Sequence, residues 1–263
     1  MDLGLKNKVA LVAASSQGLG RAVAEELAKE GASLIICGRQ TETITKTAAE
    51  LADQTGAHVL AIAADVSVRA DVKRLVESGI ARFGRIDILV TNAGGPPAGN
   101  FATITEEQWE TATRLTLFSA IDLARAVLPG MKERRWGRIL NITSIAVKQP
   151  VDNLMLSNSL RAGLTGFART LANEVAAEGI TVNNILPGYT RTERVEELAE
   201  MMAAKQGITA GDFKKKWEQE IPMGRLGEPH EFAALAAFLV SERASYITGT
   251  SIQVDGGWIR SLL

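Results

Sequence analysis

The sequence predicts an α/β fold: a doubly wound, parallel sheet of about seven strands with helices on both faces. The first observation is a rhythm, in which a short apolar run, a polar loop, a helical pattern and a glycine recur through most of the chain. The second is that several apolar runs lack in/out alternation, as strands covered on both faces do. The third is length, because 263 residues suit one such domain.

The strand predictions come first, in chain order. They cover residues 8–13, 33–37, 58–63, 86–90, 138–142, 181–186 and 251–254. Helices should fill the connections, and four glycines stand where a left-handed residue would end a helix before a strand: Gly31, Gly56, Gly84 and Gly179.

Helix starts and long helices are also predicted. Thr105 and Gln108 have the spacing of a capping box, and Pro229 suits the first turn of a helix. Two long apolar helices are expected over 106–128 and 154–177. The whole chain, 1–263, reads as one domain, and the irregular charged segment 191–222 is predicted to be a helical lid over a binding crevice.

Composition excludes several classes of function. With 29 basic and 30 acidic residues, the net charge of −1 gives no electrostatic case for nucleic acid or an anionic membrane. The only cysteine, Cys37, lies in an apolar run and is predicted to be a buried strand residue. His58 and His230 lack ligand spacing, so no metal site is expected. Apolar runs are too short for a membrane span, and we expect a cytoplasmic protein.

The turn after the first predicted strand has the composition of a dinucleotide site. Gly18 and Gly20 allow close approach of a pyrophosphate, and the following helix supplies N–H donors and positive potential. This predicts a Rossmann-type cofactor site over the consecutive residues Ala14, Ser15, Ser16, Gln17, Gly18, Leu19 and Gly20.

The end of the second predicted strand indicates which cofactor binds. An acidic residue there would accept from the ribose 2′-OH of NAD, but the chain has Arg39, whose guanidinium suits a 2′-phosphate. Ser15 and Ser16 offer further hydroxyl donors. We therefore expect NADP(H) to be favoured over NAD(H).

Five further segments follow the strands or lie near the C-terminus: Asp65-Val66, Asn92-Ala93-Gly94, Asn141-Ile142-Thr143-Ser144, Pro187-Gly188 with Thr192, and Val254-Asp255-Gly256-Gly257. Together with the glycine turn, they make the chain resemble, over nearly its full length, the short-chain dehydrogenase/reductase family, in particular members like 3-oxoacyl-acyl-carrier-protein reductase. The resemblance has further implications for the site. It implies that Asp65 contacts the adenine amino group, that 92–94 lines the cofactor, and that 187–192, with Thr190, cradles the nicotinamide end.

Two cofactor positions depart from the family pattern. Ala14 replaces its first glycine and Thr91 its first asparagine, and neither change is expected to abolish binding. The resemblance also implies a homo-oligomer, usually a tetramer, in which the two long helices meet their partners.

The catalytic positions depart further. The family uses a tyrosine as acid/base, a lysine four residues later, a serine on the substrate oxygen and an asparagine in a water relay. Here Ser144 matches the serine, but Ser157 and Arg161 stand for the tyrosine and lysine, and Thr116, counted from Trp109, stands for the asparagine. The i, i+4 spacing still predicts one helix face for Ser157 and Arg161.

The changed residues alter the chemistry. A serine hydroxyl is a much poorer acid than a phenol, and arginine cannot give up a proton, but Arg161 keeps the positive charge and is expected to bind the nicotinamide ribose of the cofactor. Tyr189 follows the turn that borders the nicotinamide in the family, but we favour packing against the crevice wall as its role. Water is the alternative to Tyr189 as the source of the proton.

Three functions remain open. The leading one is an atypical NADP(H)-dependent oxidoreductase that transfers hydride to or from a carbonyl/alcohol substrate, a small molecule that the sequence does not identify. The second is a catalytically impaired nucleotide-binding protein that acts as a sensor or scaffold. The third is a dehydration or another non-redox step in the same crevice.

Overall fold

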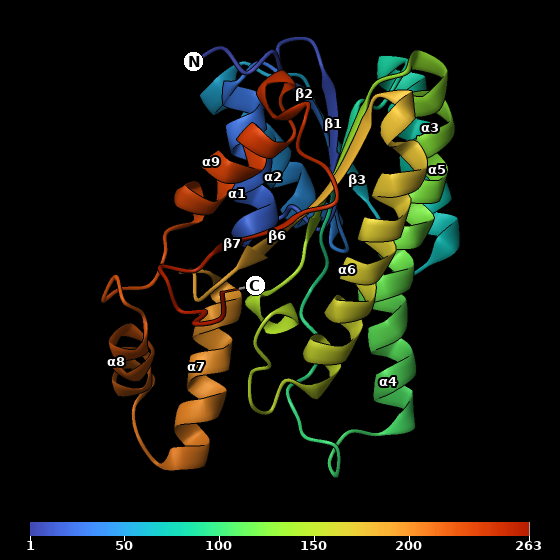
Figure 1. The fold of residues 1–263 in the computed structure, drawn as a ribbon. Helices are drawn as coiled ribbons and strands as arrows, with labels where there is room; N and C mark the ends of the chain where they lie inside the picture. Colours follow the sequence, from blue (N-terminus) through green and yellow to red (C-terminus); the bar gives the residue numbers. More distant parts are fainter. Residues whose placement is uncertain (263) are drawn as a thin grey trace.

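The computed structural model describes residues 1–262, and its centre is one sheet with the strand order β3-β2-β1-β4-β5-β6-β7, in which every pairing is parallel (Figure 1). The strands are β1 (Val9–Val12), β2 (Ser33–Gly38), β3 (Val59–Ala63), β4 (Ile88–Thr91), β5 (Gly137–Ile142), β6 (Ile180–Pro187) and β7 (Ser251–Val254). All seven predicted strands are confirmed, with ends that differ by at most two residues.

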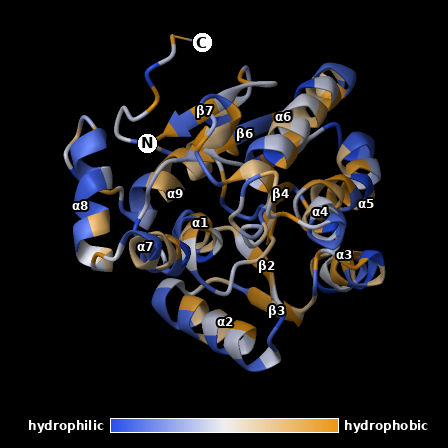
Figure 2. Ribbon diagram, turned by 90° about the horizontal axis from the view of Figure 1, so that it is seen from below, coloured by the Kyte–Doolittle hydropathy of each residue, from blue (hydrophilic) through white to orange (hydrophobic). Residues whose placement is uncertain are grey.

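Helices cover both faces of the sheet, as predicted (Figure 2). One face carries α1 (Gly18–Lys29), α2 (Thr41–Thr55) and α9 (Pro229–Leu239). The other carries α3 (Arg69–Phe83), α4 (Glu106–Thr113), α5 (Ser119–Arg134) and α6 (Met155–Val175). The chain therefore has the Rossmann-type, doubly wound architecture.

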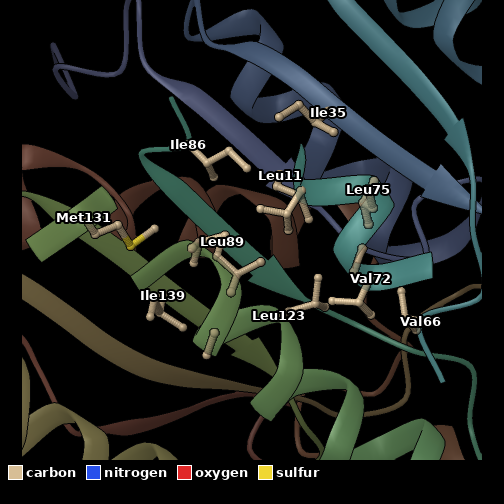
Figure 3. Packing of buried hydrophobic residues seen from close by; sticks show 14 of the residues in the cluster. Leu11, Ile35, Val66, Val72, Leu75, Ile86, Leu89, Leu123, Met131 and Ile139 are labelled. Atoms are coloured by element: carbon tan, nitrogen blue, oxygen red, sulfur yellow. The ribbon is translucent and has the colours of Figure 1, made fainter. Parts of the chain in front are cut away.

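Each face has its own apolar core. In the core beneath α3, α5 and α6, strand residues Leu11 and Leu89 face the helix residues Leu75, Leu123 and Met131 (Figure 3). Burying one such side chain contributes roughly 1.5–3 kcal/mol relative to leaving it exposed. Cys37 lies in the same core, as expected, and burial raises the pKa of its thiol to about 11.

The predicted helix boundaries have the expected local causes. Gly31, Gly56, Gly84 and Gly179 have φ values of +85°, +71°, +78° and +74°, so each is left-handed where a helix gives way to a strand. Thr105 and Gln108 form both bonds of a capping box at the start of α4. Pro229 occupies the first turn of α9.

The long helix predicted over 106–128 is present, but it differs from the prediction in two respects. It continues to Arg134, and a π-helical turn over Arg114–Phe118 separates α4 from α5. The turn inserts extra backbone into the helical ladder, which no apolar periodicity reveals. The second long helix is predicted over 154–177, and α6 occupies most of that range.

The segment 191–222, predicted to be helical, contains two helices. These are α7 (Glu193–Gln206) and α8 (Ala210–Glu220), which pack on each other around Phe213 and Trp217. Figure 1 shows both helices projecting past the end of the sheet at which the loops after the strands lie.

The part of the chain that the structure describes bears on two possible partners, a membrane and a metal ion. None of its helices is long and apolar enough to cross a membrane. It also contains no group of three or more His, Cys, Asp or Glu side chains that could hold a metal ion.

Candidate active site

The strand order reverses direction between β1 and β4, because β1 leads outward to β2 and β4 leads to β5. Ligands of open α/β sheets bind at this point, beyond the carboxyl ends of the strands. One side chain joins the two loops here: Asn92 Nδ2 donates to the carbonyl oxygen of Ala14 at 3.1 Å. This hydrogen bond holds the two loops of the candidate site together.

The glycine turn forms a cradle that has room for backbone but not for side chains. A Cβ on Gly20 would lie 2.5 Å from the Ala14 carbonyl oxygen and 2.8 Å from Asn92 Nδ2. Gln17, the N-cap of α1, makes no side-chain capping bond, so N–H groups of the first turn stay available to an anion. These features fit the pyrophosphate of a dinucleotide.

Ala14 adopts a conformation that favours glycine. Its φ is +45°, in the left-handed region, where an L-residue costs roughly 1–2 kcal/mol. The family's glycine at this position has a conformational reason, and the replacement by alanine introduces strain in addition to a methyl group.

At the end of β2, one expected donor is available and another is not. The Ser16 hydroxyl faces the end of β2, where its Oγ would lie 3.3 Å from a Cβ placed on Gly38. The next residue, Arg39, is exposed and has no partner within residues 1–262. Ser15 is fully buried, and its hydroxyl donates to the Val12 carbonyl at 2.7 Å. Its expected role as a hydroxyl donor to a 2′-phosphate is therefore wrong, because the turn points this side chain into the core.

After β3, Asp65 is half-buried with one carboxylate oxygen already used. Asp65 Oδ1 accepts from the backbone N and hydroxyl of Ser67 at 2.9 and 2.7 Å, which fixes the carboxylate. The other oxygen makes no bond within the described chain and suits an adenine amino group. Val66 is buried in the core, so its side chain supports the loop.

A buried polar ladder runs beneath the site across four strands. Thr91 Oγ1 donates to Asn141 Oδ1 at 2.7 Å, Asn141 Nδ2 to Asn184 Oδ1 at 3.0 Å, and Asn184 Nδ2 to Ser251 Oγ at 3.1 Å. Each pair is directly opposite in the strand register. Sequence reasoning missed this ladder, although polar residues inside apolar strands are its signal. Thr91 occupies the family's asparagine position and keeps a hydrogen bond there.

The turn after β6 approaches the glycine turn across the crevice. A Cβ on Gly188 would lie 2.7 Å from the Asp255 backbone, so the chain passes tightly between β6 and the C-terminal segment. Thr190 is buried, and Thr192 caps α7 by accepting from the Val195 backbone at 3.4 Å. Thr192 Cβ would be 3.8 Å from a Cβ on Gly18, so two predicted cofactor segments meet.

The expected catalytic residues gather near the end of β5. Ser144 follows β5 and accepts from the Ala146 backbone at 3.1 Å. Arg161 Nη1 donates to the carbonyls of Ile142 and Thr143 at 3.0 and 2.7 Å, which ties α6 to the strand that leads to Ser144. Burial, with a smaller contribution from the charge of Arg194, lowers the pKa of Arg161 to about 10, so it stays charged at neutral pH.

Thr116 lies on the buried side of the π-helical turn. Its hydroxyl is buried without a hydrogen-bond partner among residues 1–262. It lines a cavity of about 10 Å³, together with Asn92, Arg161 and six other residues. This volume corresponds to roughly one water molecule. Thr116, Asn92 and Arg161 are thus brought together, as the family pattern implies.

Tyr189 faces the lid, in agreement with the packing role favoured for it. Its ring stacks on Trp217 at 4.3 Å and meets Trp258 edge-on at 5.8 Å. Burial, followed by the charge of Glu220, raises the pKa of the phenol to about 12. This phenol is therefore a weaker acid than free tyrosine.

Arg194, in the first turn of α7, is a further residue at the site that sequence reasoning missed. Its Nη2 donates to the carbonyl of Pro96 at 2.9 Å, and its guanidinium lies over Gly95. Its position two residues after Thr192 was the available signal.

Comparisons with known proteins agree with this architecture. A family model described as enoyl-(acyl carrier protein) reductase matches residues 13–259. The chain is 34% identical, over 98% of its length and 99% of the relative's, to 3-oxoacyl-[acyl-carrier-protein] reductase FabG of Aquifex aeolicus.

The chain also matches solved structures over nearly its full length. L-sorbose reductase from Gluconobacter frateurii, complexed with NADPH and L-sorbose, superposes with a TM-score of 0.95 at 36% identity, covering 100% of both chains. A variant of actinorhodin polyketide ketoreductase with NADPH gives a TM-score of 0.93 at 31% identity, covering 97% of this chain and 98% of the other. Fold, site architecture and full-length similarity converge, and the chain belongs to the short-chain dehydrogenase/reductase family of oxidoreductases.

Proposed function

We propose that this protein is an NADP(H)-dependent oxidoreductase that reduces a carbonyl, or oxidises the corresponding alcohol, without a tyrosine acid/base. The observation that carries the proposal is the junction of Gly20, Ala14 and Asn92, which leaves a cradle beside the uncapped start of α1. Its support from relatives is that similar reductases are described with NADPH.

The cofactor-binding roles follow from position. The first turn of α1 would hold the pyrophosphate, Arg39 with Ser16 the 2′-phosphate, and Asp65 the adenine amino group. The 92–94 loop and the 187–192 turn would border the nicotinamide end. A charge-assisted contact of this kind contributes on the order of 1.5–3 kcal/mol, which favours NADP(H) over NAD(H).

Bound NADPH would supply a hydride to the carbonyl carbon of the substrate. Ser144 would donate a hydrogen bond to the substrate oxygen, where negative charge develops, and Arg161 adds positive potential next to that oxygen. Arg161 keeps its proton, so the proton on the product hydroxyl comes from water, which leaves as hydroxide. Thr116 and Arg161 line a cavity of about 10 Å³ that suits such a water.

The segment 191–222 acts in this proposal as a lid. Its helices have a separate apolar cluster around Phe213 and Trp217, so they can move as one unit. Tyr189 stacks on that cluster and links it to the turn after β6. Closure of such a segment excludes water from a reacting centre.

Turnover of NADPH and NADP⁺ across a panel of ketones, aldehydes and alcohols tests the proposal. We expect slow but saturable turnover, since a missing positioned acid/base costs ~10²–10⁴ in rate. Ser144→Ala should reduce it further, whereas Ser157→Ala should not. The double variant Ser157→Tyr with Arg161→Lys should raise it. No gain in the double variant, with cofactor binding intact, would contradict carbonyl reduction as the function.

A second candidate is a nucleotide-binding sensor or scaffold without catalysis. It is favoured by one observation, namely that Tyr189 packs on the lid and leaves the crevice without an acidic phenol. Calorimetric NADPH binding with no turnover of any panel member would support this candidate over the first.

A further inference from the structure

The first turn of α7 packs against the glycine turn at the start of α1. Thr192 caps α7, and its Cβ and Cγ2 would each lie 3.8 Å from a Cβ placed on Gly18. Glu193, the first residue of α7, brings its Oε2 to 3.6 Å from the same point. Thr192 and the helix that it caps therefore hold the Glu193 carboxylate beside Gly18.

The same turn is the part of the cofactor site that suits the pyrophosphate. Gln17, the N-cap of α1, makes no side-chain capping bond, and the first turn of α1 contains no acidic residue. N–H groups at an uncapped helix start attract an anion. A pyrophosphate held there would meet the carboxylate of Glu193, which approaches Gly18 from the lid.

Glu193 has no cation to neutralise it. The residue is exposed, and its carboxylate makes no ion pair or hydrogen bond to any residue between 1 and 262. The two basic residues nearest to it on the chain have other partners. Arg191 Nε lies 3.0 Å from Glu228 Oε1, and Arg194 Nη2 donates to the Pro96 carbonyl at 2.9 Å. The charge of Glu193 is therefore directed at the glycine turn without compensation.

Neighbouring charges on both helices are paired, which distinguishes them from Glu193. On α1, Arg21 Nη2 lies 2.8 Å from Glu50 Oε2. Glu196, another acid in the first turn of α7, lies 2.7 Å from Lys214 Nζ on α8. An acid in the first turn stabilises its own helix through the helix dipole, and Glu196 supplies that effect with its charge balanced. The stability of α7 therefore does not require a second, unpaired acid.

We propose that Glu193 limits the affinity of the cofactor site, because its carboxylate faces the pyrophosphate of the cofactor and repels it. Two like charges about 4 Å apart in water repel enough to change an affinity roughly fivefold, and more where water is excluded. A weaker complex releases NADP⁺ faster, which suits a site that exchanges its cofactor in every turnover. This inference rests on the proposed function because it concerns the same cofactor, but its test measures binding only.

The test is calorimetric titration of NADPH and NADH into the wild type and Glu193→Gln. We expect the variant to bind both about three- to tenfold more tightly, because both carry the pyrophosphate, and the gain to shrink at high salt. Adenosine 2′-monophosphate carries the 2′-phosphate without the pyrophosphate. Its affinity, measured by competition, should stay within about twofold of wild type.

Two control variants remove the same charge elsewhere on α7. Glu196→Gln removes it from the same helical turn, where the carboxylate faces Lys214. Glu200→Gln removes it from an exposed position two turns further along the helix. Both should bind NADPH within about twofold of wild type, because neither carboxylate approaches the glycine turn as Glu193 does.

The outcomes separate this inference from the proposed function. Equal or weaker NADPH binding by Glu193→Gln, or an equal gain in Glu196→Gln, would overturn the role of Glu193 and leave the cofactor site intact. A gain confined to Glu193→Gln and shared by NADPH and NADH would establish the role even if no ketone is turned over. Failure of every variant and of the wild type to bind either cofactor would contradict the proposed function and this inference together.

Discussion

Asn92 donates its side-chain amide to the carbonyl oxygen of Ala14, so a single hydrogen bond of 3.1 Å joins the loops that follow the two central strands. Gly20 packs against both partners of this bond, since a Cβ on it would lie within 2.8 Å of each. The cofactor cradle therefore depends on three small features: a strained alanine, a glycine and one amide.

Ala14→Gly should stabilise the protein. The left-handed φ of +45° is costly for alanine and free for glycine. We expect a gain of about 1 kcal/mol, which raises Tm by roughly 2–4 °C. Thermal unfolding checks this, with Ala52→Gly inside α2 as a control that should lose about 1 kcal/mol. An unchanged or lower Tm for Ala14→Gly would show that alanine is unstrained here.

Gly20→Ala should damage the cradle. The added methyl would lie 2.5 Å from the Ala14 carbonyl oxygen and 3.1 Å from Ser15 Cα, two backbone atoms that cannot rotate away. We expect a loss of about 1–3 kcal/mol in stability and at least tenfold weaker NADPH binding. Gly211→Ala is the matched control, because its Cβ meets only Thr209 Oγ1 at 3.7 Å. Normal NADPH affinity in Gly20→Ala would remove this turn from the cofactor site.

Arg39→Ala should reduce the preference for NADP(H). Arg39 is exposed and directly follows Gly38, the residue that the Ser16 side chain approaches. Loss of a charge-assisted contact of about 1.5–3 kcal/mol corresponds to roughly 10–150-fold weaker NADPH binding, with NADH binding unchanged. Calorimetric titration of both cofactors decides the matter. The same preference in wild type and variant would exclude Arg39 as its source.

The sequence was sufficient for the sheet because each strand has a strong local signal. Apolar runs such as 34–37 follow glycines whose φ is positive, and the crossover rule then leaves few strand orders. The loops predicted to bind the cofactor could be placed on the sheet for the same reason, since each follows directly from a strand.

What could not be predicted depends on side-chain direction and on distant partners. Ser15 and Ser16 are adjacent hydroxyls, and only the backbone turn decides that one enters the core while the other faces Gly38. The π-helical turn at Thr116 needs an extra residue that no periodicity marks. Arg194 approaches Pro96 from 98 residues away.

We expect the protein to be a homo-oligomer, with a tetramer implied by the family. Phe118 is 39% exposed on the π-helical turn, and the preceding residue, Leu117, would lie 3.9 Å from a Cβ on Gly163 of α6. Phe118→Arg should therefore produce smaller species in sedimentation velocity. Tyr246→Arg, at a fully exposed aromatic elsewhere, should sediment as wild type. A monomeric wild type at micromolar concentration would refute the prediction.

Tyr189→Phe should leave turnover and its pH profile within about twofold of wild type, an effect far below the ~10²-fold loss expected for an acid/base. The phenol is stacked on Trp217, and burial raises its pKa to about 12. Because the folded state favours the protonated phenol, its contribution to stability is complete below pH 10 and is lost as the pH rises toward 12. Urea unfolding between pH 8 and 11 should thus show a smaller decline for Tyr189→Phe than for wild type. A tenfold loss of turnover in Tyr189→Phe, with wild-type stability at pH 8, would instead assign the proton transfer to this phenol.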